Sequence, residues 1–278
     1  HILEARRMVT YVPNYYSRFK CIADKCKHTC CKGWEIDVDE KSMERFKGHE
    51  DIISKIEDDS FILQGEEERC PFLRSDLLCQ MIIDHGEDFI CDICKDHPRF
   101  RNFYDDRIEM GIGLCCESAC DLIIDNKEKF SLVPTKRLSV AIEVLNGFDK
   151  DILERLAFIS PIFLSEEQSQ DLYGEMEVLD ENCAEIIRNR EHDRNKILDY
   201  IVANKSAFEQ IALYYAYRYP QMTSFATEAC MVIAGCAIAL GGSIGDIKES
   251  ARIYSSEIEY SDVNIEMMKD VFEIIEEI

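Results

Sequence analysis

Eleven of the fourteen cysteines lie between residues 21 and 120, and their spacing is typical of metal ligation. The eleven are Cys21, Cys26, Cys30, Cys31, Cys70, Cys79, Cys91, Cys94, Cys115, Cys116 and Cys120. The first four form a C-x4-C-x3-C-C group, and Cys91 with Cys94 forms a C-x2-C pair that lets two thiolates converge on one metal from a tight turn. Thiolates suit zinc and iron–sulfur clusters, so the sequence predicts a metal-binding region that draws its ligands from these eleven residues.

A disulfide framework is the competing interpretation of these cysteines. It requires an oxidising compartment, and residues 1–20 contain no apolar segment of the kind found in secretory signals. We therefore favour metal binding and expect a cytoplasmic protein. Cys183, Cys230 and Cys236 lie apart from the cluster, and the last two occur in apolar helical sequence, where packing is the expected role.

The type of metal depends on how the ligands are distributed. Zinc sites usually consist of two close pairs, whereas these cysteines are spread over the hundred residues from Cys21 to Cys120. A [4Fe-4S] cluster accepts thiolates from distant loops, and eleven thiols could supply one or two such clusters. Iron–sulfur is the favoured prediction and zinc is the alternative. The adjacent Cys30 and Cys31 point in different directions, so they either serve two centres or include one structural residue.

The charge limits the classes of partner. The formal net charge is -23, which repels nucleic-acid phosphates and attracts a basic partner such as a lysine-bearing polypeptide. The simpler interpretation is that the charge keeps the protein soluble. The most apolar run, 229–242, is too short to span a bilayer, so we expect a buried helix and no membrane partner.

The element pattern predicts a mainly α protein with two domains. Met8 is the expected initiator, so a loop-rich cysteine/metal domain is predicted over 8–130 and an all-helical domain over 131–278, with the boundary near Pro134. Residues 9–39 are expected to be irregular, and Arg107 to Leu114 is a candidate strand. A helix is predicted over 40–57, with Asp39 as its N-cap. Further helices are predicted over 117–125, 137–147, 166–189, 194–203, 205–218, 223–240 and 263–277. Gly241 and Gly242 are expected to end the helix over 223–240.

Several short motifs occur in a recognisable order within residues 11–125. They are Phe19-Lys20-Cys21, Cys30-Cys31-Lys32-Gly33-Trp34, Cys70-Pro71-Phe72-Leu73, Leu78-Cys79, His85-Gly86-Glu87, Cys91-x2-Cys94 with His97-Pro98-Arg99, and Leu114-Cys115-Cys116-Glu117. This order resembles the flagellin lysine-N-methylase family, within a wider group of CxxCxxCC-type cysteine-cluster proteins. Cys116 stands where the family commonly has proline, Cys120 is an additional cysteine, and His97 replaces a tyrosine, so the resemblance supports Cys115 as a ligand more than Cys116 or Cys120.

The resemblance implies an iron–sulfur protein that transfers methyl from S-adenosylmethionine to lysine nitrogens, with flagellin as the substrate of the namesake members. The usual radical C-x3-C-x2-C triad is absent, because Gly33 follows Cys26-x3-Cys30 at the third position. The alternative function is a non-catalytic iron–sulfur or zinc module for electron transfer or protein interaction.

Three side chains are candidate catalytic residues. Glu117 could accept the amine proton or provide a helix N-terminal charge, and Arg99 could offset cluster charge or hold a carboxylate of the donor. Tyr217 could orient the amine, although a tyrosine in an apolar helix more often belongs to the core.

Overall fold

The computed structural model describes residues 9–135 and 164–276, which form two compact units. Residues 20–98 form one unit, here called the thiol unit. Residues 9–19 and 99–276 form the other, here called the helical unit. These bounds differ from the expected 8–130 and 131–278, because the first strand pairs with strands that follow the thiol unit in the sequence.

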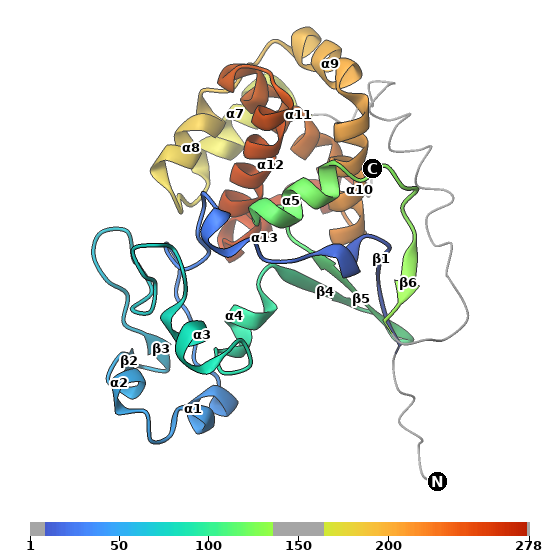
Figure 1. Ribbon diagram of the computed structural model, residues 1–278. Helices are drawn as coiled ribbons and strands as arrows, with labels where there is room; N and C mark the ends of the chain where they lie inside the picture. Colours follow the sequence, from blue (N-terminus) through green and yellow to red (C-terminus); the bar gives the residue numbers. More distant parts are fainter. Residues whose placement is uncertain (1–8, 136–163, 277–278) are drawn as a thin grey trace. The chain divides into compact units, whose positions relative to one another are not determined.

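The thiol unit consists of short elements joined by loops (Figure 1). They are η2 (Ala23–Lys25), α1 (Glu40–Phe46), α2 (Glu50–Ile53), β2 (Ile56–Glu57), β3 (Ser60–Phe61), α3 (Gln80–His85) and α4 (Asp92–Asp96). The N-cap at Asp39 is confirmed, since its carboxylate accepts the N–H of Ser42 at 3.0 Å. The expected helix over 40–57 is instead split in two, because Gly48 adopts a φ of 87° and turns the chain between α1 and α2.

A four-stranded sheet belongs to the helical unit, in the order β4-β5-β1-β6. Its strands are β1 (Val9–Pro13), β4 (Arg99–Phe103), β5 (Arg107–Ile112) and β6 (Leu132–Pro134). The strand expected from Arg107 is confirmed as β5. The irregular segment expected from residue 9 is wrong at its start, where β1 runs parallel to β5 with Val9 opposite Arg107. β6 lies within the span that was expected to be all-helical, so that description needs correction.

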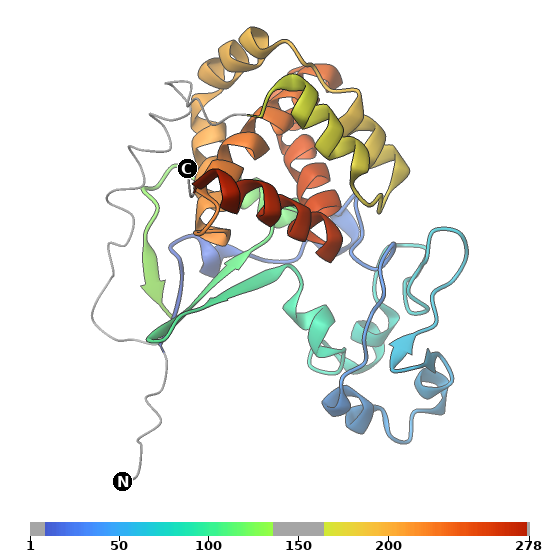
Figure 2. The same cartoon turned by 180° about the vertical axis from the view of Figure 1, so that it is seen from behind.

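Helices make up the rest of the helical unit, and the mainly α prediction holds. They are η1 (Tyr16–Arg18), α5 (Glu117–Ile124), α7 (Glu166–Glu175), α8 (Glu181–Arg188), α9 (Arg194–Ala203), α10 (Lys205–Arg218), α11 (Thr223–Leu240), α12 (Ile244–Glu259) and α13 (Asp262–Glu276). α11 packs against α8, α9, α10, α12 and α13, and the view from behind in Figure 2 brings α13, drawn in dark red, to the front. None of the described helices combines the length and the apolar character that a bilayer-spanning helix needs.

Three predicted helices match the structure residue for residue, namely α9, α10 and α11. The helix predicted over 166–189 breaks at 176–180, because Asp180 caps a new helix by accepting the N–H groups of Asn182 and Cys183. α12 was not predicted, although Ser243 and Asp246 form a capping box at its start. The helix expected over 137–147 lies outside the described residues.

Candidate functional site

Five of the predicted ligands come together in the thiol unit. Cys70 and Cys91 belong to its apolar core, and Cys31, Cys79 and Cys94 pack against that core. Short backbone contacts fix their positions. The N–H of Cys70 donates to the carbonyl of Cys31 at 2.8 Å, Leu73 pairs with Cys79 in an isolated bridge, and the Cys91 and Cys94 thiols hydrogen-bond to each other beside the first turn of α4. A chain with little regular structure therefore gathers thiols from four separate segments.

The thiols of this group affect one another's ionisation. Burial raises the pKa of the Cys70 thiol to about 12, and the neighbouring Cys31, Cys79 and Cys91 add to the shift. By contrast, a hydrogen bond from Cys30 lowers the pKa of the Cys31 thiol to about 7. Because thiolates in one place repel each other, several can ionise together only if a positive charge lies among them. A metal ion provides that charge and deprotonates the thiols it binds.

The donors fit a thiolate-bound metal in type and number. In the ranges 9–135 and 164–276, however, no group of three or more His, Cys, Asp or Glu side chains lies in an arrangement that could hold a metal ion. Cys31, Cys70, Cys79, Cys91 and Cys94 share one core and are the candidate ligands, and metal binding by them stays a prediction.

The first cysteine group differs in exposure from this pool. Cys21 and Cys30 are exposed, and the Cys26 thiol donates to the carbonyl of His28 at 3.0 Å. Two motif residues contact each other near this group. Trp34 donates its indole N–H to the carbonyl of Cys30 at 2.8 Å and stacks on His97 with 6.2 Å between ring centres.

Cys115, Cys116 and Cys120 belong to the helical unit. Cys116 occupies the N-cap position of α5. Cys120 is buried on α5, and its thiol donates to the carbonyl of Lys248 on α12 at 3.3 Å. Cys115 Sγ lies 2.9 Å from the hydroxyl of Tyr260, and burial raises the pKa of this thiol to about 12.

A buried polar network lies beside Cys115. Arg218 Nε is 3.1 Å from the carboxylate of Glu259, whose side chain is fully buried. The Tyr214 hydroxyl donates to the same carboxylate at 2.9 Å and accepts from Arg218 at 2.8 Å and from the N–H of Leu114 at 3.3 Å. Ser255 also donates to Glu259. This network ties α10 and α12 to the loop that carries Cys115.

Glu259 and Arg218 were not among the site residues predicted from the sequence. The sequence offered one signal for them, since each is a charged residue at the end of a helix, Arg218 on α10 and Glu259 on α12, on the same face as apolar residues. Buried charged groups with perturbed ionisation occur often at functional sites.

The structure places the three catalytic candidates in different environments. Arg99 begins β4 and donates to the hydroxyl of Tyr16 at 2.7 Å, with its guanidinium 5.5 Å from the centre of the Phe19 ring. Glu117 is the first residue of α5. Tyr217 is buried on α10, and its hydroxyl finds no hydrogen-bond partner among the described residues. Burial raises the pKa of Tyr217, so its phenol stays protonated.

Comparison with known proteins gives distant but consistent relatives. The chain is 22% identical over 175 residues to a lysine-N-methylase of Salmonella typhimurium, and the match covers 58% of this chain and 40% of that protein. A lysine-N-methylase of Salmonella choleraesuis is 21% identical over the same length, again with 40% of that protein covered. The flagellar biosynthetic protein FliU of Salmonella muenchen is 24% identical over 141 residues, which are 46% of this chain and 83% of FliU.

No family model and no solved structure matches the chain. The chain thus spans about 40% of the length of the two lysine-N-methylases that it matches. The matches agree with the family that the order of the cysteine motifs indicates. The resemblance to the flagellin lysine-N-methylase family is therefore confirmed as a distant similarity to these proteins.

Proposed function

We propose that this chain acts in the N-methylation of lysine side chains on a flagellar protein, with S-adenosylmethionine as methyl donor. The observation that carries the proposal is the similarity to two proteins named lysine-N-methylase and to a flagellar biosynthetic protein. The acidic net charge of -23 is consistent with a lysine-bearing substrate, because opposite charges steer association.

The reaction sets clear demands on the side chains. A lysine amine has a reference pKa of about 10.4, so it must lose a proton before its lone pair can attack. The nitrogen then attacks the methyl carbon, the carbon–sulfur bond breaks, and the sulfonium becomes a neutral thioether. Glu117 is the proposed proton acceptor and Arg99 the proposed partner of the donor's carboxylate. Tyr217 is poorly suited to accept the proton, since its buried phenol is already protonated.

We propose further that the thiol unit holds a [4Fe-4S] cluster, or two, with zinc as the alternative metal. The residues that would hold it come from the pool of Cys31, Cys70, Cys79, Cys91 and Cys94, with Cys21, Cys26 and Cys30 as further donors. When bound, the metal centre would supply cross-links between loops and an additional charge. The chain's own residues bring the thiols into one core and balance their ionisation.

A non-catalytic metal module is the second candidate function. The favouring observation is that the thiols lie in the core of a separate unit whose longest helix has seven residues. In such a unit, ligation alone supplies much of the folding free energy and gives the metal a sufficient structural role. Binding of S-adenosylmethionine separates the two functions.

The test uses anaerobically purified protein with iron and sulfide analysis and an absorption spectrum. We expect broad absorption near roughly 400 nm for thiolate-bound clusters. The protein is then incubated with labelled S-adenosylmethionine and flagellin from its host, or with a host lysate where no flagellin exists. Methyl mass on lysine, reduced in Glu117→Gln and unchanged in the control Asp199→Asn at an exposed position of α9, supports the proposal. Absence of both donor binding and methyl transfer favours the non-catalytic module, and stoichiometric zinc without sulfide excludes the iron–sulfur cluster.

A further inference from the structure

Four exposed apolar residues of the helical unit belong to two segments that hydrogen bonds bring together. Val178 and Leu179 lie in the connector 176–180 between α7 and α8, and Tyr260 and Val263 lie at the junction of α12 and α13. Their exposed fractions are 37%, 39%, 40% and 53%, respectively. We call these four residues the 178–263 patch. Single exposed apolar residues are common, but a contiguous group with a polar rim marks an interaction site.

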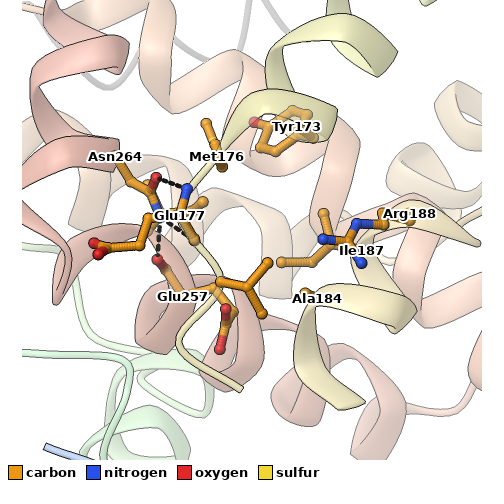
Figure 3. Close-up of a pocket in the computed structure, with 10 residues that line it drawn as sticks. Tyr173, Met176, Glu177, Ala184, Ile187, Arg188, Glu257 and Asn264 are labelled. Carbon is orange, nitrogen blue, oxygen red and sulfur yellow. Dashed lines mark hydrogen bonds between the residues drawn. The ribbon is translucent and has the colours of Figure 1, made fainter. Parts of the chain in front are cut away.

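Hydrogen bonds hold the two halves of this patch together. The carboxylate of Glu257 accepts the N–H groups of Leu179 at 3.1 Å and Asp180 at 2.9 Å. Asn264 accepts the N–H of Glu177 at 2.8 Å and donates to the Glu177 carbonyl at 2.9 Å, as Figure 3 shows. The connector is therefore fixed against the α12–α13 junction, and its apolar side chains project from a rigid base rather than from a loose loop.

The rim of the patch is acidic. Five exposed carboxylates lie within three residues of a patch residue in the sequence, and two cations form ion pairs with them. The carboxylates belong to Glu177, Asp180, Glu181, Asp262 and Glu266, and the cations to Arg188 and Lys269. Both cations are already paired, Arg188 with Glu181 at 2.8 Å and Lys269 with Glu266 at 3.1 Å. The remaining excess of negative charge complements a basic partner.

We infer that the 178–263 patch docks a lysine-bearing, partly apolar segment of the substrate protein. The inference rests on the proposed function and names the surface where its substrate binds. The apolar centre accounts for affinity and the acidic rim for the preference for lysine. The Tyr260 hydroxyl, at one edge of the patch, lies 2.9 Å from Cys115 Sγ, so the docking surface continues to the cysteine motif of the helical unit.

Binding of a labelled peptide tests the inference on the full chain. The probe is a twelve-residue peptide of alternating lysine and leucine, and the reference probe carries glutamate in place of lysine. Fluorescence anisotropy should show that the lysine peptide binds and that the glutamate peptide does not. Because the rim acts through charge, raising the salt from about 50 to about 300 mM should weaken binding several-fold.

Variants locate the binding surface. Leu179→Ser removes an apolar contact and Glu266→Lys reverses one rim charge, and each should weaken binding at least about tenfold if the patch is a hot spot. Val202→Ser and Asp199→Lys make the same changes at exposed positions of α9 and should leave binding unchanged. Equal weakening in the α9 variants would show that binding follows net charge alone and would overturn the inference, as would absence of binding.

Two further outcomes would identify a different occupant. A dimer that dissociates in Leu179→Ser, measured by analytical ultracentrifugation, would assign the patch to a second copy of the chain. Hydrogen-exchange protection of residues 178–179 that is lost after cleavage within 136–163 would assign it to that segment. If both patch variants transfer methyl with an unchanged KM, the docking inference is wrong and the proposed methyltransferase function is unaffected. If the peptide binds through the patch but no methyl is transferred, the proposed function is wrong and the patch remains a binding surface.

Discussion

Tyr214 and Tyr217 lie three residues apart on α10, and their buried hydroxyls have opposite environments. The Tyr214 hydroxyl bonds to Glu259, Arg218 and the N–H of Leu114, whereas the Tyr217 hydroxyl finds no partner in the described parts of the chain. Burying a polar group is unfavourable unless it is hydrogen-bonded. The same substitution at the two positions should therefore have opposite effects.

We expect Tyr214→Phe to lower the free energy of unfolding by about 1–3 kcal/mol, because it leaves Glu259 and the Leu114 N–H short of a partner. Tyr217→Phe should leave stability unchanged or raise it by up to about 1 kcal/mol. Urea unfolding followed by circular dichroism measures both. Equal losses in the two variants would contradict the different environments of these hydroxyls.

The Arg218–Glu259 ion pair gives a second prediction for single residues. Glu259→Gln keeps the shape of the side chain but leaves the Arg218 guanidinium buried without its counter-charge, so we expect a loss of about 3–5 kcal/mol. Glu209→Gln on α10 is the matched control. Its partner Lys205 is 67% exposed, and an exposed pair contributes only about 0–1 kcal/mol. Urea unfolding measures the loss of unfolding free energy in both variants. Similar losses would show that burial does not account for the contribution of the Arg218–Glu259 pair.

Residue types and spacing predict a group of cysteines, and five of the eleven predicted ligands do share one core, whereas their binding of metal stays a prediction and the buried network was not predicted. Cys91 and Cys94 are close in sequence, so their proximity follows from local geometry. The grouping of Cys31 and Cys70 depends on a contact between segments 39 residues apart, which the sequence only suggests through its excess of thiols. The ion pair between Arg218 and Glu259 forms because their helices, α10 and α12, lie close together in the fold. No local sequence pattern predicts a contact between these two residues.

At the scale of elements, the connector 176–180 depends on the ionisation of Glu257. Burial raises the pKa of this carboxyl from 4.5 to about 7 although two backbone N–H groups favour its charged form. The folded state therefore holds the proton more tightly than the unfolded state between these two values. The contribution of Glu257 to stability is favourable at low pH and is lost as the pH rises through about 7.

We accordingly expect Glu257→Gln to gain stability relative to wild type by roughly 2–3 kcal/mol when the pH is raised from about 5 to about 8, because glutamine does not ionise. Unfolding curves of both proteins at the two pH values give this difference, in which other titrating groups cancel. Glu266→Gln, an exposed carboxyl on α13, serves as the control. A stability difference that is independent of pH would show that Glu257 is ionised to the same extent in both states.

Three helices with strong local signals were predicted to the residue, although α12 was missed despite its capping box, and the strands defined by distant partners were not predicted. α9, α10 and α11 each carry a long apolar pattern with clear ends. β1 is a strand because β5, almost a hundred residues later, pairs with it, and β6 has only three residues and ends in Pro134. Neither strand has enough length for an alternating pattern to stand out.

For the whole molecule, the two units should respond differently to loss of metal. The thiol unit has a core of only ten buried residues, two of them cysteines, whereas the helical unit has a far larger apolar core of its own. Under the proposed metal binding, we expect chelation, or the double change Cys91→Ser and Cys94→Ser, to expose residues 20–98 to protease while far-UV helicity is largely retained.

Limited proteolysis with mass spectrometry identifies the cleavage sites in this experiment. Cys183→Ser, a half-buried cysteine of the helical unit, is the control and should leave the thiol unit protected. Loss of helicity in proportion to cleavage would show instead that the two units unfold as one.

The parallel pairing of β1 with β5 also bears on how the chain is made. Everything in the thiol unit lies in the connection between these two strands, so β1 leaves the ribosome long before its neighbour exists. Synthesis proceeds at about 5–20 residues per second, so β1 stays without β5 for roughly 5–20 s, and the finished thiol unit precedes the end of β5 by about 1–3 s. Under the proposed metal binding, the thiol unit can begin to acquire its metal while β1 is still unpaired.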